Sequence, residues 1–368
     1  MPESFEVSTS VGSYKVIVGK GLLANIAPSK HDIFLVDQFH LSSLNLNTDR
    51  LIAIPALESS KNLDYMPQVI ERMRKLGANR QTHVYAIGGG IIQDIATFVN
   101  SIYMRGIAWT YFPSTLLSMA DSCIGGKSSI NVAGYKNLVG NIYPPSAVYV
   151  DMDFCKTLGK NEIIGGLAEA VKICFARGPE FFDAYFALSP IYPLSGEEGV
   201  KVVSQALQAK KWFIEIDEFD QSERLLLNYG HTFGHALEAS SNFALAHGVA
   251  VAIGMLVAIE YATYVDNLSG IGKVKSAQLE RYIVDLIEPL KVEICEILSR
   301  IDLASVMQKF EGDKKHQQDF YRMIIPASSG GLIVTSVPKN SKSLAQIHSA
   351  YEGAFIKHGF FVNSAIVK

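Results

Sequence analysis

Three histidines in a short stretch are the residues best able to do chemistry in this chain. His231 and His235 lie four residues apart in a segment with helical periodicity, so we expect both side chains on one face of a helix. His247 begins the apolar helical segment that follows. Neutral imidazoles, completed by a carboxylate from elsewhere in the chain, are common ligands of a catalytic zinc ion. The spacing therefore predicts a metal site with positions left open for a substrate.

By spacing alone, His231 and His235 would both be metal ligands, as in the helical HExxH motif of zinc proteases. That motif needs a glutamate directly after the first histidine, and Thr232 stands there. The pattern therefore argues against a zinc protease.

Two glycine-containing segments are candidates for binding phosphate. Residues 88–90 are three glycines between a predicted strand and a helix bearing Asp94, and form either a nucleotide site at a helix N-terminus or a plain turn. Residues 121–127 read DSCIGGK, and Lys136-Asn137 follow. Lysines beside glycine turns can bind phosphate, although a solvated loop is the commoner outcome. The position after a parallel strand favours binding, since ligands gather at the carboxyl ends of such strands.

Glu169 and Lys172 lie three residues apart on an apolar helical segment, so they share one face. An exposed ion pair would be the ordinary interpretation on a polar helix. Charged groups are seldom buried without a partner, and a metal would supply one for Glu169.

Lys210, Arg224 and Asn228 precede the histidines and form a second cationic group. An arginine can hold a carboxylate or phosphate through two hydrogen bonds. In the alternative interpretation, Lys210 lies on an exposed basic face and Arg224 pairs with a neighbouring acid.

The bulk composition is typical of a soluble globular protein with two domains, since 368 residues exceed what a single core usually holds. Lys and Arg number 33 against 36 Asp and Glu, so no basic excess suggests nucleic acid or a membrane as partner. The four cysteines show no CxxC pairing, which favours reduced thiols in the cytoplasm. No signal peptide is expected, and the apolar run 248–259 is too short to span a bilayer and predicts a buried helix.

Strands and helices alternate in the first part of the chain. Residues 14–18, 33–36, 83–90 and 109–115 resemble strands, and 66–76 and 91–106 resemble helices. This alternation predicts a mainly parallel sheet covered by helices over residues 1–160. Residues 161–368 are largely helical in periodicity, with late strands at 322–325 and 331–334.

Eight sequence blocks together identify a family resemblance over nearly the whole chain. They are ALESSK (56–61), GGGIIQD (88–94), FPSTLLSMADSCIGGK (112–127), GYKNLVG (134–140), GLAEAVK (166–172), LLNYGHTFGHALE (226–238), HGVAVAIGM (247–255) and DKK (313–315). In this order they resemble 3-dehydroquinate synthases and, more widely, the sugar phosphate cyclases. The resemblance implies an α/β Rossmann-like NAD-binding domain over 1–160 and an all-α zinc- and substrate-binding domain over 161–368.

The resemblance also implies roles for particular residues. The zinc ligands would be Glu169, His231 and His247, so that His235 faces the substrate instead of the metal. The catalytic residues would be Asp121, Lys127, Lys172 and His235. The substrate would contact Arg105, Lys127, Asn137, Lys210, Arg224, Asn228, His235, Lys314 and Lys315, with Lys210 and Arg224 on its carboxylate and Arg105 supplied by the neighbouring subunit of a homodimer. NAD would contact Asp37, Glu58, Lys61, Gly89, Gly90, Ile91, Asp94, Ser114, Thr115, Lys127, Lys136 and Thr157.

In this family a seven-carbon keto-acid phosphate is oxidised by NAD, loses phosphate by β-elimination, is reduced again, and closes to a carbocycle by an aldol step. The carboxylate clamp favours this substrate over sedoheptulose 7-phosphate or glucose 6-phosphate, which cyclases of secondary metabolism use. An iron-dependent alcohol dehydrogenase and an inactive scaffold are further alternatives.

Several positions depart from the family pattern. Ser114 replaces threonine and keeps its hydroxyl, and Ser128-Ser129 follow the loop lysine. Gln93 replaces a glycine, which is expected to bring a side chain to a turn where a ligand's close approach matters.

Overall fold

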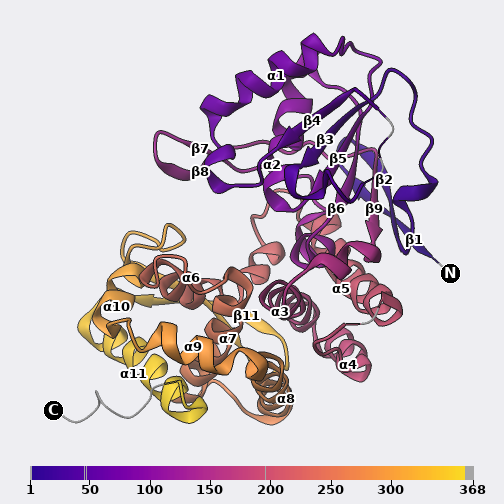
Figure 1. The fold of residues 1–368 in the computed structure, drawn as a ribbon. Coiled ribbons are helices and arrows are strands. Elements are labelled where there is room, and N and C mark those ends of the chain that lie inside the picture. Colours follow the sequence, from indigo (N-terminus) through magenta and orange to yellow (C-terminus); the bar gives the residue numbers. More distant parts are fainter. Residues whose placement is uncertain (1, 45, 47, 195, 361–368) are drawn as a thin grey trace. The chain divides into compact units, whose positions relative to one another are not determined.

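The computed structural model describes residues 2–44, 46, 48–194 and 196–360, and these form two compact units (Figure 1). The first unit comprises Met1–Leu158 and Ser195–Glu218, and the second comprises Gly159–Leu194 and Phe219–Lys368. The first change of unit, after residue 158, lies close to the predicted domain end at 160.

A seven-stranded sheet forms the centre of the first unit. Its strands follow the spatial order β1 (Glu3–Thr9), β2 (Gly12–Gly19), β9 (Ala147–Asp151), β6 (Trp109–Pro113), β5 (Val84–Gly88), β3 (Ile33–Asp37) and β4 (Leu51–Ile54). β1 and β2 pair antiparallel, and every other pair in this sheet is parallel. β3, β5 and β6 are almost wholly buried, as expected for parallel strands covered on both faces. The predicted α/β fold is confirmed.

Among its described residues, the first unit contains three α-helices. α1 (Met66–Lys75) contacts β4, and α2 (Gly90–Ile102) contacts β3, β5 and β6. α5 (Gly196–Ile216) contacts β1, β2 and the short helices η6 (Ser118–Ser122) and η7 (Met152–Thr157). A small hairpin of β7 (Ile130–Val132) and β8 (Tyr135–Val139) completes it.

The second unit is mainly helical. Its helices are α3 (Lys160–Arg177), α4 (Pro179–Leu188), α6 (His231–Ser240), α7 (His247–Tyr264), α8 (Gly270–Ile287), α9 (Lys291–Leu298), α10 (Leu303–Glu311) and α11 (Ser341–His358). α7 contacts α3, α6, α8 and α11, so it forms the core of the unit. Among the described residues α7 alone is long and apolar enough to cross a bilayer, but 78% of it is buried inside the structure. The predicted buried helix is therefore confirmed.

Two features differ from the predicted architecture. The segment of α5 was expected in the helical domain, but its buried face packs on the sheet unit instead. The second unit also contains a two-stranded antiparallel hairpin, β10 (Phe320–Pro326) and β11 (Leu332–Pro338), so it is not all-helical. The late strands expected at 322–325 and 331–334 lie within this hairpin or at its turn.

Candidate active site

Three imidazole rings lie close together in the second unit. α6 carries His231 and His235, and α7 begins with His247. The ring centroids are 5.1 Å apart for His231 and His235 and 5.4 Å apart for His231 and His247. One ring nitrogen of each histidine lies within 4.8 Å of the others. The predicted shared helix face is confirmed, and the cluster is compact enough to surround one metal ion.

Glycines allow α6 and α7 to approach closely. A Cβ atom at Gly234 would lie 2.6 Å from the Ala250 oxygen, and one at Gly254 would lie 2.1 Å from the Gly230 oxygen. Gly230, directly before α6, also has φ of 74°, a conformation that costs glycine little. Substitution at any of these positions would push apart the two helices that carry the histidines.

α3 brings a buried charge pair to the same unit. It packs on α7 where Gly165 and Gly248 meet, and a Cβ atom at Gly248 would lie 2.4 Å from the Gly165 Cα. One turn further, Lys172 Nζ donates to Glu169 Oε2, and both side chains are almost fully buried. The exposed ion pair considered from the sequence is therefore wrong.

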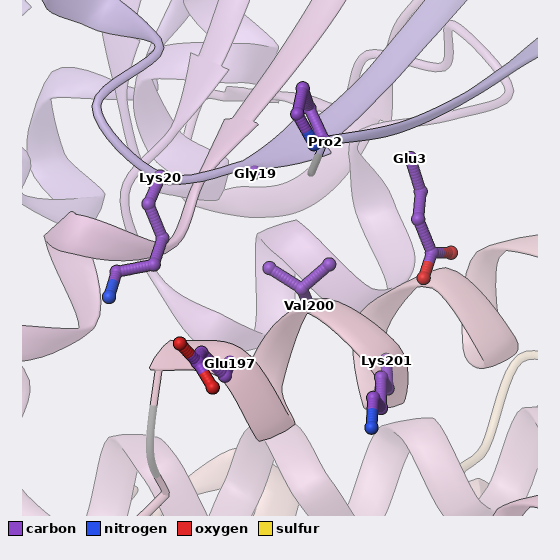
Figure 2. A pocket seen from close by; sticks show the side chains of 7 residues that line it. All are labelled: Pro2, Glu3, Gly19, Lys20, Glu197, Val200 and Lys201. Atoms are coloured by element: carbon purple, nitrogen blue, oxygen red, sulfur yellow. The ribbon is translucent and has the colours of Figure 1, made fainter.

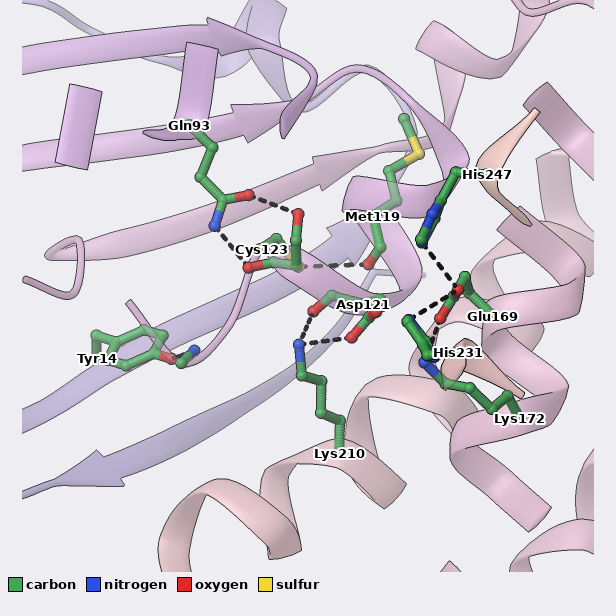
Figure 3. A network of polar contacts seen from close by, with 12 residues as sticks. Tyr14, Gln93, Met119, Asp121, Cys123, Glu169, Lys172, Lys210, His231 and His247 are labelled. Carbon is green, nitrogen blue, oxygen red and sulfur yellow. Dashed lines mark hydrogen bonds and ion pairs between the residues drawn. The ribbon is translucent and has the colours of Figure 1, made fainter. Parts of the chain in front are cut away.

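The other oxygen of Glu169 faces the histidines (Figure 3). Glu169 Oε1 lies 3.8 Å from His231 Nε2 and 3.6 Å from His247 Nε2, and it has no hydrogen-bond partner among the described residues. Other groups orient the opposite ring nitrogens. His231 Nδ1 lies 3.2 Å from the backbone oxygen of Tyr229, and His247 Nδ1 lies 3.1 Å from Glu238 Oε2. Both Nε2 atoms are thus left to converge on the carboxylate.

This donor set fits a divalent metal. Two imidazole nitrogens and a carboxylate oxygen are common zinc ligands, and ligand histidines usually place their other nitrogen on a carbonyl or carboxylate. A cation here would also satisfy the buried Glu169 oxygen. Sequence reasoning missed Glu238, although it lies three residues after His235 on the same helix, a spacing that could have found it.

The pKa values of the histidines follow from their surroundings. Burial, and then the charges of Lys172 and Lys315, hold the pKa of His231 well below its usual value. Burial and Lys315 lower the pKa of His235 to about 4. Burial lowers the pKa of His247 too, but the hydrogen bond to Glu238 and the charge of Glu169 outweigh it and raise the value. His231 and His235 are therefore neutral near pH 7.

A small cationic cavity of about 90 Å³ lies in the same unit. It is lined by Leu225, Asn228, Thr232, Lys315, Arg322, Met323 and Ile324. Lys315 Nζ is buried and has no hydrogen-bond partner in the described part of the chain, whereas Lys314 is exposed. Of the two predicted lysines, the geometry thus places Lys315 in the pocket. Arg322 was not predicted as a site residue, although it lies between two buried residues, Tyr321 and Met323, on the late strand β10.

The predicted carboxylate clamp contains Lys210 and Arg224, and both are buried, at 6% and 5% exposure. In the first unit Lys210 Nζ donates to Asp121 Oδ1 and to the Asp121 backbone oxygen, each at 2.6 Å (Figure 3). Arg224 lies in η8 (Glu223–Asn228) of the second unit. The exposed basic face considered for Lys210 is therefore wrong.

The glycine turn joins β5 to α2 in the first unit. A Cβ atom at Gly90 would meet nothing within 4 Å, so this backbone is open to a ligand, and the first amides of a helix lack partners within it. The Tyr111 hydroxyl holds the turn in place, because its proton is shared between the backbone oxygens of Gly88 and Gly89. The Ser114 amide also donates to the Gly88 oxygen. These features fit an anionic nucleotide phosphate.

The polar residues expected around a nucleotide form two groups of contacts. Lys61 Nζ lies 2.9 Å from Asp94 Oδ2, and Asp94 Oδ1 accepts from the Ser129 amide. Burial raises the pKa of Asp94 despite the charge of Lys61. Glu58 Oε1 accepts from Asn131 Nδ2 at 2.7 Å.

The remaining predicted residues occupy more open positions. Asp37 ends β3 and accepts from the Phe39 amide, while Ile91 lies in the first turn of α2 and Thr115 hydrogen bonds to Ser118. The backbone of Lys127 pairs with that of Ile142 in an isolated antiparallel β-bridge. The other predicted residues of the first unit are exposed: Arg105, Lys136, Asn137 and Thr157.

Gln93 does not enter the glycine turn. Its side chain is 4% exposed and forms two hydrogen bonds with Ser122, one to the backbone oxygen and one from the hydroxyl, each 2.6 Å long. The expectation that it would obstruct the approach of a ligand was wrong, because the amide points to η6.

A larger hollow of about 560 Å³ lies elsewhere in the first unit, between the start of β1, the end of β2 and the start of α5 (Figure 2). Its charged side chains have both signs: Glu3, Lys20, Glu197 and Lys201. None of the predicted site residues lines it, so it is not the candidate active site.

Family models match most of the chain. Residues 51–165 match the N-terminal domain of 3-dehydroquinate synthase, and residues 166–316 match its C-terminal domain. A 3-dehydroquinate synthase of Dictyoglomus turgidum is 33% identical over 339 residues, which cover 89% of this chain and 93% of that protein.

Solved structures share the fold. A 2-deoxy-scyllo-inosose synthase complexed with carbaglucose-6-phosphate, NAD⁺ and Co²⁺ superposes with a TM-score of 0.80 at 22% identity, covering 94% of this chain and 100% of that one. The 2-epi-5-epi-valiolone synthase of Streptomyces hygroscopicus subsp. jinggangensis, with NAD⁺ and Zn²⁺ bound, superposes with a TM-score of 0.71 at 23% identity, covering 94% and 96%.

Proposed function

Because the chain belongs to the 3-dehydroquinate synthase family, we propose that it converts 3-deoxy-D-arabino-heptulosonate 7-phosphate to 3-dehydroquinate and phosphate. This reaction is a step of the shikimate pathway of aromatic amino acid biosynthesis. The observation that carries the proposal is the 33% identity to a 3-dehydroquinate synthase along 89% of the chain. Loss of phosphate breaks a carbon–oxygen bond, so the enzyme is a carbon–oxygen lyase.

Two cofactors accompany this function. Glu169, His231 and His247 would hold a divalent metal, zinc or cobalt, which supplies Lewis-acid polarisation of the substrate hydroxyl that is oxidised. The open glycine turn at the start of α2, with Lys61 and Asp94 nearby, would hold NAD, which supplies reversible hydride acceptance with no net redox change.

The two anionic ends of the substrate match two cationic groups. Lys315 and Asn228 line the small cavity and would hold the phosphate, with Arg322 as a further donor. Lys210 and Arg224 would hold the carboxylate, since a guanidinium binds a carboxylate through two hydrogen bonds. Fixing both ends orients the ring for the chemical steps.

The remaining polar groups would orient the substrate and hold its protons. His235 is neutral near pH 7, so one of its ring nitrogens can donate to the substrate while the other accepts. Asp121 accepts from Lys210, and Lys172 donates to Glu169 in a buried position. Lys127 would add positive charge near the departing phosphate.

The partner is therefore a small phosphorylated keto acid, not a nucleic acid or a membrane. We also propose a cytoplasmic homodimer in which Arg105, exposed on η5 (Tyr103–Arg105), serves the neighbouring subunit. An exposed guanidinium on a tight turn is available for such a contact.

Phosphate release by the purified protein with NAD and zinc tests the function. The keto-acid phosphate and sedoheptulose 7-phosphate are offered in parallel. We expect turnover of the keto acid. Turnover of sedoheptulose 7-phosphate alone would overturn the proposal in favour of a cyclase of secondary metabolism.

A further inference from the structure

The helix η6 is a π-helical turn. The Cys123 amide donates to the Ser118 oxygen at 3.0 Å, five residues back along the chain, instead of the usual four. π-Helical turns are rare and are frequent at functional sites. This one carries Asp121, the partner of Lys210.

The last backbone oxygens of any helical turn need partners from outside it. Here Lys210 donates to the Asp121 oxygen, and Gln93 Nε2 donates to the Ser122 oxygen. The Ser122 hydroxyl donates in return to Gln93 Oε1 (Figure 3). Two side chains from different helices, α5 and α2, thus cap the two residues that end the turn.

The cap depends on an unusual residue. Gln93 is 4% exposed, and its side-chain amide makes both hydrogen bonds with Ser122. A glycine at residue 93 would leave the part-buried Ser122 backbone oxygen without this donor, and the loss of such a hydrogen bond destabilises the turn.

We propose that Gln93 is a positioning residue for substrate binding, which fastens the π-helical turn and thereby fixes the Asp121–Lys210 pair. The proposal rests on the function above, in which Lys210 holds the substrate carboxylate. A loosened turn moves Asp121 and releases Lys210 from its bonded geometry.

Gln93→Met tests this directly, because methionine keeps the volume and removes both hydrogen bonds. We expect the KM for the keto-acid phosphate to rise about tenfold, the effect of losing one aligned charged contact. Loss of folded enzyme alone would lower kcat and leave KM unchanged. Gln68→Met, at an exposed position on α1, is the matched control and should change neither constant.

Ser122→Ala separates the two hydrogen bonds, since it removes the hydroxyl and keeps the backbone oxygen. We expect it to change KM less than Gln93→Met, and the double variant to resemble Gln93→Met alone. A Gln93→Met enzyme whose KM stays within twofold of the parent would overturn the proposal.

Amide hydrogen exchange provides a readout independent of activity. Exchange at the Cys123 amide should quicken in Gln93→Met and not in Gln68→Met, and unchanged exchange would overturn the proposal. If the parent protein does not turn over the keto acid, the proposed function is wrong. The rate of amide exchange at Cys123 would still show whether Gln93 stabilises the π-helical turn.

Should Gln93→Met fail to fold, Gln93→Glu replaces it. A protonated carboxyl can donate to the Ser122 oxygen and an ionised one cannot. A free glutamate ionises at about pH 4.3 and burial raises that value. The kcat/KM of Gln93→Glu relative to the parent should therefore fall as the pH rises through the pKa of the introduced carboxyl, and a ratio that stays constant from about pH 4 to about pH 9 would overturn the proposal.

Discussion

At the scale of single residues, the two carboxylate oxygens of Glu169 have different surroundings. One oxygen pairs with Lys172, while the other is buried, faces two imidazoles, and lacks a hydrogen-bond partner among the described residues. Such an oxygen is costly unless a cation compensates it. The residue therefore implies a metal more directly than any single histidine does.

Replacement of His247 by alanine should abolish tight metal binding, because it removes one of three proposed ligands. We expect metal content after dialysis to fall from about one ion per chain to less than about a tenth. His348→Ala, on the surface of α11, is the control and should retain its metal. Full occupancy in His247→Ala would refute the ligand set.

Arg224→Ala should impair use of the carboxylate substrate selectively. Truncation of a buried charge that binds an opposite charge costs about 2–5 kcal/mol, so kcat/KM for the keto acid should fall at least about thirtyfold. Sedoheptulose 7-phosphate, tested as substrate or competitive inhibitor, lacks the carboxylate and should be affected little. Equal losses for both compounds would contradict the clamp.

Phosphate affinity should decrease as the pH rises through about 8. Burial and the charge of Lys172 lower the pKa of Lys315, and Asp313, Asp220 and Glu169 partly oppose them, so that the pKa is about 8. The ammonium of Lys315 is therefore charged below this pH and neutral above it. Competitive inhibition by inorganic phosphate, measured from pH 6 to 10, should weaken about tenfold per unit above pH 8.

Paired variants check the assignment to Lys315. Lys314→Met should keep the pH dependence of phosphate inhibition, because Lys314 is exposed. Inorganic phosphate should inhibit the Lys315→Met enzyme only weakly, and to the same extent at every pH. The same profile in both variants would show that another group titrates.

At the scale of elements, the α6–α7 contact is the most sensitive part of the site. A Cβ atom at Gly234 would meet the backbone of Ala250 at 2.6 Å, and backbone cannot move aside as a flexible side chain can. Gly234→Ala should therefore lower the free energy of unfolding by about 1–3 kcal/mol. Thermal unfolding measures this, and Gly331→Ala, where a Cβ meets nothing within 4 Å, is the control. Equal stabilities would contradict the close packing.

Sequence periodicity predicted the helices with one buried face and the strands that are buried along nearly their whole length. α1 was expected at 66–76 and spans Met66–Lys75, and β3 was expected at 33–36 and spans Ile33–Asp37. β1 was not predicted, because most of its residues are exposed and its pairing with β2 forms the edge of the sheet. Edge strands carry a weak hydrophobic pattern, so sequence alone seldom reveals them.

A motif or the family resemblance pointed to Glu169, His231 and His247 as candidate ligands, and the structure brings these three residues together. The convergence of Glu169 with His231 and His247 joins three helices, which spacing could not show. Glu238 was missed although its spacing from His235 could have indicated it, whereas Arg322 was missed because it lines a cavity with residues far away in the sequence, such as Asn228. Gln93 was misjudged because only the packing of α2 reveals that its amide reaches Ser122.

At the scale of the whole molecule, Arg105 makes the proposed dimer testable. A chain with Arg105→Ala and a chain with His247→Ala should each be inactive, yet a mixed dimer would contain one complete site. Coexpression with two affinity tags should restore about a quarter of parent activity under random pairing. No recovery in purified mixed dimers would show that each Arg105 serves its own chain.

The path of the chain has a consequence for synthesis on the ribosome. The first unit needs α5, which is made only after the opening helices of the second unit, so the ribosome adds about 60 residues between Leu158 and Glu218, where the first unit is complete. At about 5–20 residues per second, the sheet waits roughly 3–12 s for the helix that packs against β1 and β2. During that interval its apolar surface is open to chaperones, and a nascent chain released before residue 218 could not complete either unit.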